Sequence, residues 1–272
     1  MDLGLESCTG IVVGGSKGIG KAIALELASE GVDLALAART KEPLEAAAAE
    51  ISAATGRRVI AISCDVTHRE QVEAMVEEAV GFLGGLNVLV NSGSAPGGSA
   101  TATGYIDTIV DEDFLEDCNV KYLGALRCAR ACIPHLKQSG RGRIINISGL
   151  NARIAGNLSG GARNTSLVHL SKTLANQLGR DGVTVNCIHP GITRTERTEG
   201  LLRSRAERKG LTAADVEAGD YAKSNPRANA IGRMVDAREI AYLAAFLCSD
   251  KAWAVTGEVI AADGGGSSSV YY

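Results

Sequence analysis

Short runs of apolar, often β-branched residues alternate along this chain with longer segments whose apolar positions recur at helical spacing. A short apolar run between turn residues is typical of a strand buried on both faces, whereas a longer periodic segment is typical of an amphipathic helix. The runs predict strands at Thr9–Val13, Val32–Ala38, Val59–Ser63, Asn87–Asn91, Arg143–Ser148, Thr184–Ile188 and Glu258–Ala262. The periodic segments predict helices at Lys21–Ser29, Pro43–Ala54, Arg69–Leu83, Phe114–Gln138, Ser166–Leu178 and Ala237–Leu247.

This alternation predicts an α/β fold, in which one doubly wound parallel sheet of about seven strands (a Rossmann fold) carries helices on both faces. Residues 1–272 are predicted to form a single domain, because folds of this kind commonly reach this size as one unit. The rhythm breaks once, over a charged segment at about 193–234. Ligands of such sheets bind beyond the carboxyl ends of the strands, so this insertion is predicted to act as a lid.

Composition narrows the class of protein further. Hydrophobic residues make up 45% of the chain and aromatic residues only 4%, so the core is expected to consist of Val, Ile, Leu and Ala. A formal net charge of −3 gives no reason to expect nucleic acid or an anionic membrane as partner.

The seven cysteines are odd in number and form no C-x-x-C pair. This argues against a disulfide framework and against a zinc site, so no metal is expected. Cys128 and Cys132 lie four positions apart on a predicted helix and are interpreted as small core residues. The first residues lack a basic stretch followed by an apolar one, and no run approaches about 18 apolar residues. We therefore expect a soluble, cytoplasmic protein.

The turn after the first predicted strand is rich in glycine and reads Val13-Gly14-Gly15-Ser16-Lys17-Gly18-Ile19-Gly20. A dinucleotide site needs a strand, a glycine loop and a helix in this order. The glycines let the backbone approach a pyrophosphate, and the helix points its unpaired N–H groups at the phosphates. A tight turn without ligand is the alternative interpretation, and the position of the loop in the chain favours nucleotide binding.

Further motifs follow in order along the chain, and together they resemble the short-chain dehydrogenase/reductase family over nearly its whole length. Asp65 with Val66 stands where the family binds adenine, and Asn91 begins a variant of the family's Asn-Asn-Ala-Gly. Asn119 matches a helix asparagine that orders a water near the active site. The segment His189-Pro190-Gly191-Ile192-Thr193 matches the one that flanks the nicotinamide. The resemblance implies cofactor contacts at Gly14, Ser16, Lys17, Gly18, Ile19, Gly20, Arg39, Asp65, Val66, Asn91, Pro190, Gly191 and Thr193.

The end of the second predicted strand bears on the choice of cofactor. NAD(H) sites of this fold usually carry a carboxylate there to bind the ribose 2′-hydroxyl, whereas a 2′-phosphate requires cations. This strand ends in Ala37-Ala38-Arg39, and Lys17 lies in the neighbouring glycine loop. An arginine forks onto phosphate oxygens and stays charged. The two residues favour NADP(H) over NAD(H), with solvated surface charges as the alternative.

The catalytic motif of the resembled family is absent. The family opens a helix with Tyr-x-x-x-Lys, the proton donor and its electrostatic helper, and here the register places Gly160 and Asn164 at those positions. No tyrosine occurs between Tyr122 and Tyr221, so an alignment slip does not recover one. The family's serine motif matches Ser148 followed by glycine, so Ser148 is the candidate that remains.

Other polar residues are candidates to compensate, and with Ser148 we name Arg163 and Asn119 as catalytic. Arg163 neighbours Asn164 and is suited to stabilise an oxyanion. Lys121 and Tyr122 lie about 200° and 300° round an α-helix from Asn119, which favours Tyr122 as the residue that shares its side. A histidine at position 189 is expected to titrate near neutral pH.

These features predict an NADP(H)-dependent oxidoreductase that transfers hydride to a small carbonyl or related C=N substrate, with an atypical active site. The alternatives are an inactive, cofactor-sensing protein and a non-redox lyase or isomerase on the same fold. The charged lid sequence Arg194-Thr195-Glu196-Arg197 favours a polar or anionic substrate. The resembled family pairs subunits through the helices at Phe114–Gln138 and Ser166–Leu178, so we expect a homotetramer or homodimer.

Overall fold

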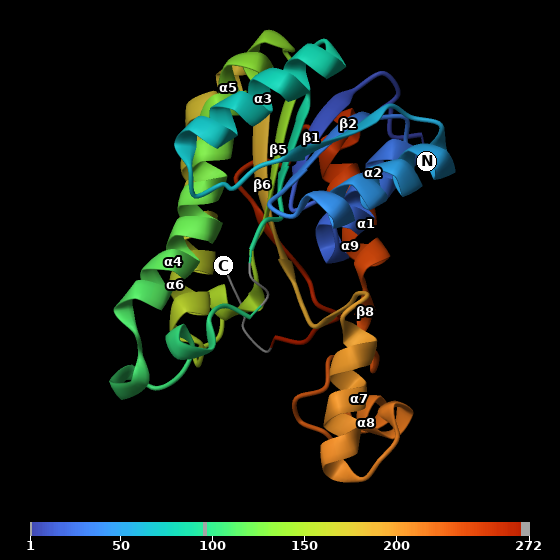
Figure 1. Ribbon diagram of the computed structural model, residues 1–272, viewed down its shortest axis with the longest axis vertical. Helices are drawn as coiled ribbons and strands as arrows, with labels where there is room; N and C mark the ends of the chain where they lie inside the picture. Colours follow the sequence, from blue (N-terminus) through green and yellow to red (C-terminus); the bar gives the residue numbers. More distant parts are fainter. Residues whose placement is uncertain (1, 95–96, 268–272) are drawn as a thin grey trace.

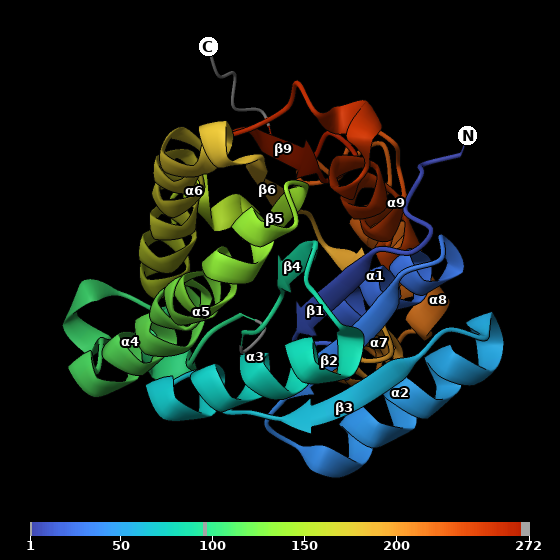
Figure 2. The ribbon, with the colours of Figure 1, turned by 90° about the horizontal axis from the view of Figure 1, so that it is seen from above.

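The computed structural model describes residues 2–94 and 97–267. Seven parallel strands form the central sheet in the order β3-β2-β1-β4-β5-β6-β9. Figure 2 shows these strands side by side, seen from above. The strands are β1 (Thr9–Val13), β2 (Asp33–Ala38), β3 (Val59–Ser63), β4 (Val88–Asn91), β5 (Gly142–Ile147), β6 (Val183–Pro190) and β9 (Val259–Ala262). The predicted doubly wound sheet is confirmed, and the strand order reverses between β1 and β4, where folds of this type bind their ligands.

Helices cover both faces of this sheet (Figures 1 and 2). One face carries α1 (Gly18–Ser29), α2 (Lys41–Thr55) and α9 (Ala237–Cys248), and the other carries α3 (Arg69–Leu83), α5 (Gly124–Gln138) and α6 (Leu158–Leu178). The side chains of each strand alternate between the two cores: Val12 packs with the first group of helices, and Ile11 and Val13 pack with the second. Both faces of the strands are therefore buried, as the apolar runs predicted.

The long helix predicted at Phe114–Gln138 is interrupted. It consists of α4 (Asp111–Cys118), a π-helical turn at Asn119–Leu123 and α5. The residue that follows the turn, Gly124, packs so tightly that a Cβ there would lie 2.6 Å from Cγ2 of Val66. A π turn adds a residue to the helical repeat, so side chains within it point in directions that an α-helix does not predict.

The segment predicted as a lid contains two helices that the hydrophobic pattern did not reveal, α7 (Thr198–Lys209) and α8 (Ala213–Asp220). They are framed by a two-stranded ladder of β7 (Thr193–Arg194) and β8 (Val235–Asp236). Figure 1 shows the two helices projecting beyond one end of the sheet. They hold each other through a small apolar cluster and through a two-pronged ion pair in which Arg205 donates to both oxygens of Asp220 at 2.6 Å.

Three smaller findings complete the fold. Helix α6 starts at Leu158, eight residues before the predicted Ser166, because its first turns are too poor in large apolar residues to show helical periodicity. Cys128 and Cys132 are both fully buried in the core, as predicted. Among the described residues, no helix combines the length and the hydropathy needed to cross a membrane.

Candidate active site

The glycine loop between β1 and α1 brings the backbone close to the end of β4. Gly14 has a φ of +80°, and a Cβ on it would lie 2.7 Å from the carbonyl carbon of Ser92. Only glycine fits this conformation and this spacing. The helix that follows begins at Gly18, and the side chain of its N-cap residue Lys17 makes no capping hydrogen bond. The N–H groups of its first turn point out of the helix, in a direction that suits an anion such as a dinucleotide pyrophosphate.

The lid reaches this same helix end. The N–H of Gly18 donates to Oε2 of Glu196 at 2.9 Å, and the methyl group of Thr195 stands 3.5 Å from the position of a Cβ on Gly18. Residues 178 positions apart in the sequence therefore meet at the phosphate-binding end of α1. A carboxylate here holds the place that a phosphate would take.

The adenosine end of the predicted cofactor site lies beyond β2 and β3. Arg39 follows β2 directly and is exposed, as is Lys17. Asp65 follows β3 and accepts hydrogen bonds from the amide and hydroxyl of Thr67. Burial raises the pKa of Asp65, but these hydrogen bonds and the nearby charge of Arg39 outweigh it and lower the pKa below its ordinary value. The carboxylate is therefore ionised, and the hydrogen bonds from Thr67 fix its orientation.

The predicted nicotinamide end lies where β6 approaches the loop after β9. Pro190 is the last residue of β6, and Thr193 folds back so that its Oγ1 donates to the carbonyl of Gly191 at 2.9 Å. A Cβ on Gly191 would lie 2.8 Å from Cα of Asp263, so this close approach requires glycine. The segment is held rigidly at the carboxyl end of the sheet.

A chain of amides fixes Asn91 at the end of β4. Its Nδ2 donates to Oδ1 of Asn146 at 2.9 Å, and Nδ2 of Asn146 donates to Oγ of Ser171 at 2.9 Å. The other amide atom of Asn91, Oδ1, is buried and has no hydrogen-bond partner among the described residues. This oxygen is an acceptor beside a small cavity at the β1–β4 switch point.

Ser148 is placed between β5 and α6. Its Oγ donates to the main-chain carbonyl of Asn164 at 3.0 Å, and its side chain is buried. A Cβ at the next position, Gly149, would lie 2.8 Å from Nδ2 of Asn164. The sequence therefore brings Ser148 and the position expected for the family's lysine into direct contact, but this position carries an uncharged amide.

The position expected for the family's tyrosine is filled by other groups. Gly160 lies in the first turn of α6, and its N–H donates to Oδ1 of the capping residue Asn157 at 2.7 Å. A Cβ on Gly160 would lie 2.7 Å from that same oxygen and 2.7 Å from Nδ2 of Asn151. Two amide side chains therefore occupy the space in which a longer side chain at position 160 would begin.

Arg163 is buried beside Asp117 of α4. Asp117 accepts hydrogen bonds from the hydroxyl of Ser159 at 2.6 Å and from the main chain and hydroxyl of Ser99. Burial raises the pKa of Asp117, and the hydrogen bonds together with the charge of Arg163 outweigh it and lower that pKa. The carboxylate in turn offsets part of the cost of burying the guanidinium. The positive charge of Arg163 is thus largely compensated by the neighbouring carboxylate of Asp117.

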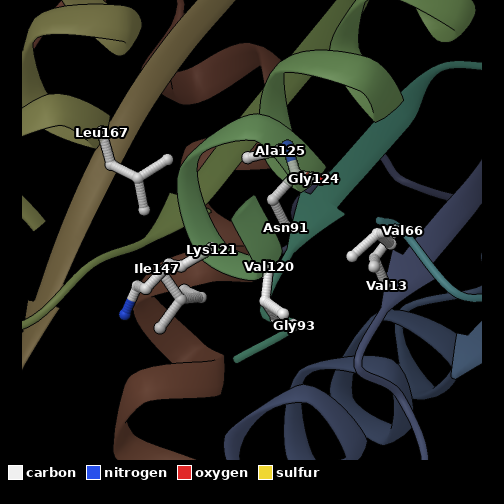
Figure 3. Close-up of a pocket in the computed structure, with 10 residues that line it drawn as sticks. All are labelled: Val13, Val66, Asn91, Gly93, Val120, Lys121, Gly124, Ala125, Ile147 and Leu167. Carbon is white, nitrogen blue, oxygen red and sulfur yellow. The ribbon is translucent and has the colours of Figure 1, made fainter. Parts of the chain in front are cut away.

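A lysine that the sequence reasoning passed over lies in the middle of this site. Lys121 belongs to the π turn, is only 7% exposed and donates from Nζ to the main-chain carbonyl of Ser148 at 3.0 Å. It lines a cavity of about 10 Å³, the space of one water molecule, together with Val13, Val66, Asn91, Gly93, Val120, Gly124, Ala125, Ile147 and Leu167. Figure 3 shows its side chain running past Ile147 with the nitrogen at its tip.

The charge state of Lys121 is set by its surroundings. Burial lowers the pKa of its amine to about 7, and the positive charge of Arg163 acts in the same direction. A lysine with such a pKa exchanges its proton near neutral pH, which an exposed lysine does not.

Comparison with known proteins places the chain in a family. A family profile described as "Enoyl-(Acyl carrier protein) reductase" matches residues 13–267. The short-chain reductase protein NovJ of Streptomyces niveus is 34% identical over 261 residues, which cover 96% of this chain and 94% of that protein. The chain belongs to the short-chain dehydrogenase/reductase family.

Solved structures of similar proteins agree with this family and with the fold. The structure of L-sorbose reductase from Gluconobacter frateurii, complexed with NADPH and L-sorbose, has a TM-score of 0.91 and 29% sequence identity. The match covers 99% of this chain and 100% of that one. The structure of YwfH, an NADPH-dependent reductase involved in bacilysin biosynthesis, has a TM-score of 0.84 at 29% identity, with 97% of this chain and 99% of that chain covered.

In this short-chain dehydrogenase/reductase, the π turn reverses the expected roles of two neighbouring residues. Oδ1 of Asn119 accepts from Arg127 at 2.9 Å, and its Nδ2 donates to Glu116, so the side chain of Asn119 is engaged along its own helices. Tyr122 lines an open groove beside α6 with His169. α-Helical angles favoured Tyr122 over Lys121 as the residue that shares the side of Asn119. Within the π turn, Lys121 lines the buried cavity and Tyr122 lines the outer groove.

His189 is also placed differently from its expectation. It is 1% exposed, and burial together with the charges of Arg153 and Lys121 lowers the pKa of its imidazole to about 4. The ring is therefore neutral at physiological pH, and the expectation that it titrates there was wrong. The sequence held no sign of this burial, since a histidine near the end of a strand is equally compatible with solvent.

Proposed function

We propose that the protein is an NADPH-dependent reductase of a small, polar ketone or aldehyde. When bound, the cofactor supplies the hydride that adds to the carbonyl carbon. The observation that carries the proposal is the end of β2, where Arg39 takes the place of the carboxylate expected for NAD(H) and Lys17 lies in the adjacent glycine loop. NADPH in the structure of L-sorbose reductase, at 29% identity, supports the same cofactor.

The residues on the β1–α1 turn fit such a cofactor without rearrangement of the main chain. Gly14 leaves room for a backbone approach, and α1 directs the N–H groups of its first turn at a pyrophosphate, which would displace Glu196 from the N–H of Gly18. We assign the adenosine to Asp65 and Val66 and the nicotinamide end to Asn91, Pro190, Gly191 and Thr193, with Ser16, Ile19 and Gly20 completing the glycine loop. The fit of these residues supports binding of the cofactor across the switch point.

The proposed substrate is polar because polar groups surround the place where it would lie. The amides of Asn151 and Asn157 meet in front of α6, and the lid that begins at Thr193 carries Arg194, Glu196 and Arg197. The resemblance to a reductase crystallised with L-sorbose, a polyhydroxy ketone, supports the same class. We propose that the segment 193–234 closes over such a substrate and that the whole chain acts as one domain.

In this proposal Ser148, Arg163 and Asn119, which the sequence marks as catalytic candidates, mainly hold other groups of the site in position. Ser148 ties β5 to α6 and presents its carbonyl to Lys121. Arg163 holds Asp117 and the loop at Ser99, and Asn119 begins the π turn. We propose that the three residues keep the site in shape rather than exchange protons with the substrate.

Two measurements test this function. Calorimetry should show NADPH binding more than about tenfold tighter than NADH, with Arg39→Ala erasing most of the difference, because the 2′-phosphate loses its bidentate partner. The control Arg69→Ala, on the exposed start of α3, should leave the difference intact. Equal affinities of the parent protein for both cofactors would refute the assignment.

The second measurement is turnover. Incubation with NADPH and a panel of hydroxyketones, ketoses, aldehydes and imines should oxidise the cofactor with at least one hydroxylated carbonyl compound. The competing function, a protein that binds NADPH without reducing anything, is favoured by Gly160, which offers no phenol. Tight NADPH binding with no oxidation across the panel would decide for this competitor.

A further inference from the structure

Lys121 carries a buried amine whose hydrogen-bond acceptor is an uncharged group. Its side chain is 7% exposed, and its Nζ donates to the uncharged main-chain carbonyl of Ser148. Within residues 2–94 and 97–267, no carboxylate forms an ion pair with it. Burial of a charge without an anion costs stability, and an apolar side chain of similar length would fill the same space without this penalty.

The amine lies at the point where the family's own acid–base residues are lost. The main-chain carbonyl of Ser148 accepts a hydrogen bond from Nζ of Lys121, and the hydroxyl of Ser148 donates one to the main-chain carbonyl of Asn164. Ser148 thus connects Lys121, in the π turn, with Asn164 of α6, whose side chain carries no charge. The cavity that Lys121 lines is also lined by Val13, Asn91 and Gly93, at the switch point where the cofactor is proposed to bind (Figure 3).

We propose that Lys121 donates the proton that completes the reduction, in place of the phenol that position 160 does not supply. This role rests on the proposed function. Hydride from NADPH adds to the carbonyl carbon and leaves NADP⁺, and the electron pair of the C=O π bond moves to the oxygen. The oxygen takes a proton from the Nζ ammonium of Lys121, so that an alcohol and a neutral amine result. Water returns a proton to the amine before the next turnover.

The surroundings of Lys121 suit this exchange. Arg163 faces it from α6 and favours the neutral amine. Cys187 and His189 face it from β6: the thiol of Cys187 stays protonated because burial raises its pKa to about 11, and the imidazole of His189 stays neutral. Asp117 on α4 is held by Ser159 and Ser99. A general acid is most effective when its pKa lies near the working pH, and burial brings the pKa of Lys121 to about 7.

Substitutions of Lys121 distinguish a proton donor from a residue that acts only through its charge. Lys121→Met keeps the length and removes the proton, so the rate of carbonyl reduction should fall by about 10²–10⁴ while NADPH affinity stays within about twofold. Lys121→Arg keeps the charge but releases no proton at neutral pH, so it should not restore the rate. The control Tyr122→Phe alters the next residue of the π turn, whose side chain lies in the outer groove, and should keep the rate.

The outcomes are distinct. An active parent whose Lys121→Met variant is equally active overturns the role of Lys121 and leaves the proposed function standing. Restoration by Lys121→Arg also overturns it, because charge alone would then suffice. A parent inactive on every carbonyl compound with NADPH bound would instead remove the proposed function, and the donor role with it.

An NMR measurement tests the protonation of Lys121 directly and does not depend on the activity of any variant. In the NADPH complex with ¹³C at Cε of lysine, one NMR signal should titrate near pH 7 and be missing in Lys121→Met. The rate of reduction should fall as the pH rises through the same value, because the amine then loses its proton. Lysine signals that all titrate above about pH 9, as unperturbed lysines do, would overturn the proposal.

Discussion

At the scale of single residues, charge and its absence decide the behaviour of this protein. Arg39 follows β2, where a carboxylate would favour NAD(H), and Asn164 occupies the position at which the family resemblance leads us to expect a lysine. Both positions can be found from the sequence, because each is expected at a definite distance from a motif. Lys121 lies in the same site and belongs to no motif. Lys121 becomes visible only with its depth in the fold.

The buried amine has a consequence for stability. The pKa of Lys121 is lowered from its ordinary value of 10.5 to about 7, so between these pH values the unfolded chain binds a proton that the folded chain does not. Stability therefore falls as the pH drops from 10.5 toward 7; below 7 this loss is complete, and the group adds no further dependence on pH. Each pH unit in this window corresponds to about 1.4 kcal/mol for one proton.

Urea denaturation of the parent and of Lys121→Met across this range measures the effect. The methionine variant should be the more stable protein at pH 7, and the difference should shrink steadily as the pH approaches 10. Other titrating groups are common to both proteins and cancel in the difference. A stability difference that does not change with pH would show that the amine is not held neutral by burial.

At the scale of elements, two local features shape the site: the start of α6 and the contact between the lid and α1. Helix α6 begins with two glycines that look alike in the sequence but differ in their surroundings. A Cβ on Gly160 would lie 2.7 Å from two amide side chains, whereas a Cβ on Gly161 meets only the carbonyl of Asn151, at 3.5 Å. The periodicity of a helix gives no information on such neighbours.

The two glycines therefore predict opposite effects of the same substitution. Gly161→Ala should stabilise the protein by about 0.5–1 kcal/mol, because alanine favours a helix over glycine. Gly160→Ala should destabilise it by about 1–2 kcal/mol, because the added methyl displaces Asn151 and the capping amide of Asn157. Thermal or urea unfolding of the pair provides the test, and stabilisation by both substitutions would contradict this account of α6.

The lid contact predicts an effect on the cofactor. Glu196 places a carboxylate on the N–H of Gly18, where a pyrophosphate would bind. The two anions compete, so Glu196→Gln should tighten NADPH binding by about two- to fivefold, the range that 0.3–1 kcal/mol at a helix end allows. Calorimetry measures it, with Glu199→Gln as control, since Glu199 pairs with Arg203 on the surface of α7. Weaker binding by Glu196→Gln would mean that the carboxylate supports the closed site.

At the scale of the whole molecule, apolar surface gathers on one flank. Tyr105 and Ile106 are 83% and 82% exposed, and Leu115 on α4 is 65% exposed. The groove lined by Tyr122 and His169 lies beside α6 on the same side of the sheet as α4 and α5. Exposed apolar side chains beside such a groove are a feature of surfaces that another subunit covers.

We accordingly expect a homodimer or homotetramer that uses this flank. Light scattering at micromolar concentration should give the mass of two or four chains, and Leu115→Glu should shift the population toward smaller species. The substitution Leu201→Glu, at an exposed leucine of α7 away from this flank, is the matched control. A parent protein that is entirely monomeric would exclude the assembly.

The sequence by itself determined the seven strands of the central sheet, the helices that alternate with them and the glycine loop after β1, although it did not reveal α7, α8 or the π turn. These depend on patterns within a few neighbouring residues: apolar runs, helical spacing and glycines at a strand end. Only the tertiary structure decided which side chains meet. The π turn directs Lys121 inward, Arg163 faces Asp117, and Glu196 lies on Gly18 across 178 positions of the chain. The physical reason is that the direction of a side chain follows from the hydrogen-bond register of its helix. That register is set by packing against distant elements, as where Gly124 lies against Val66.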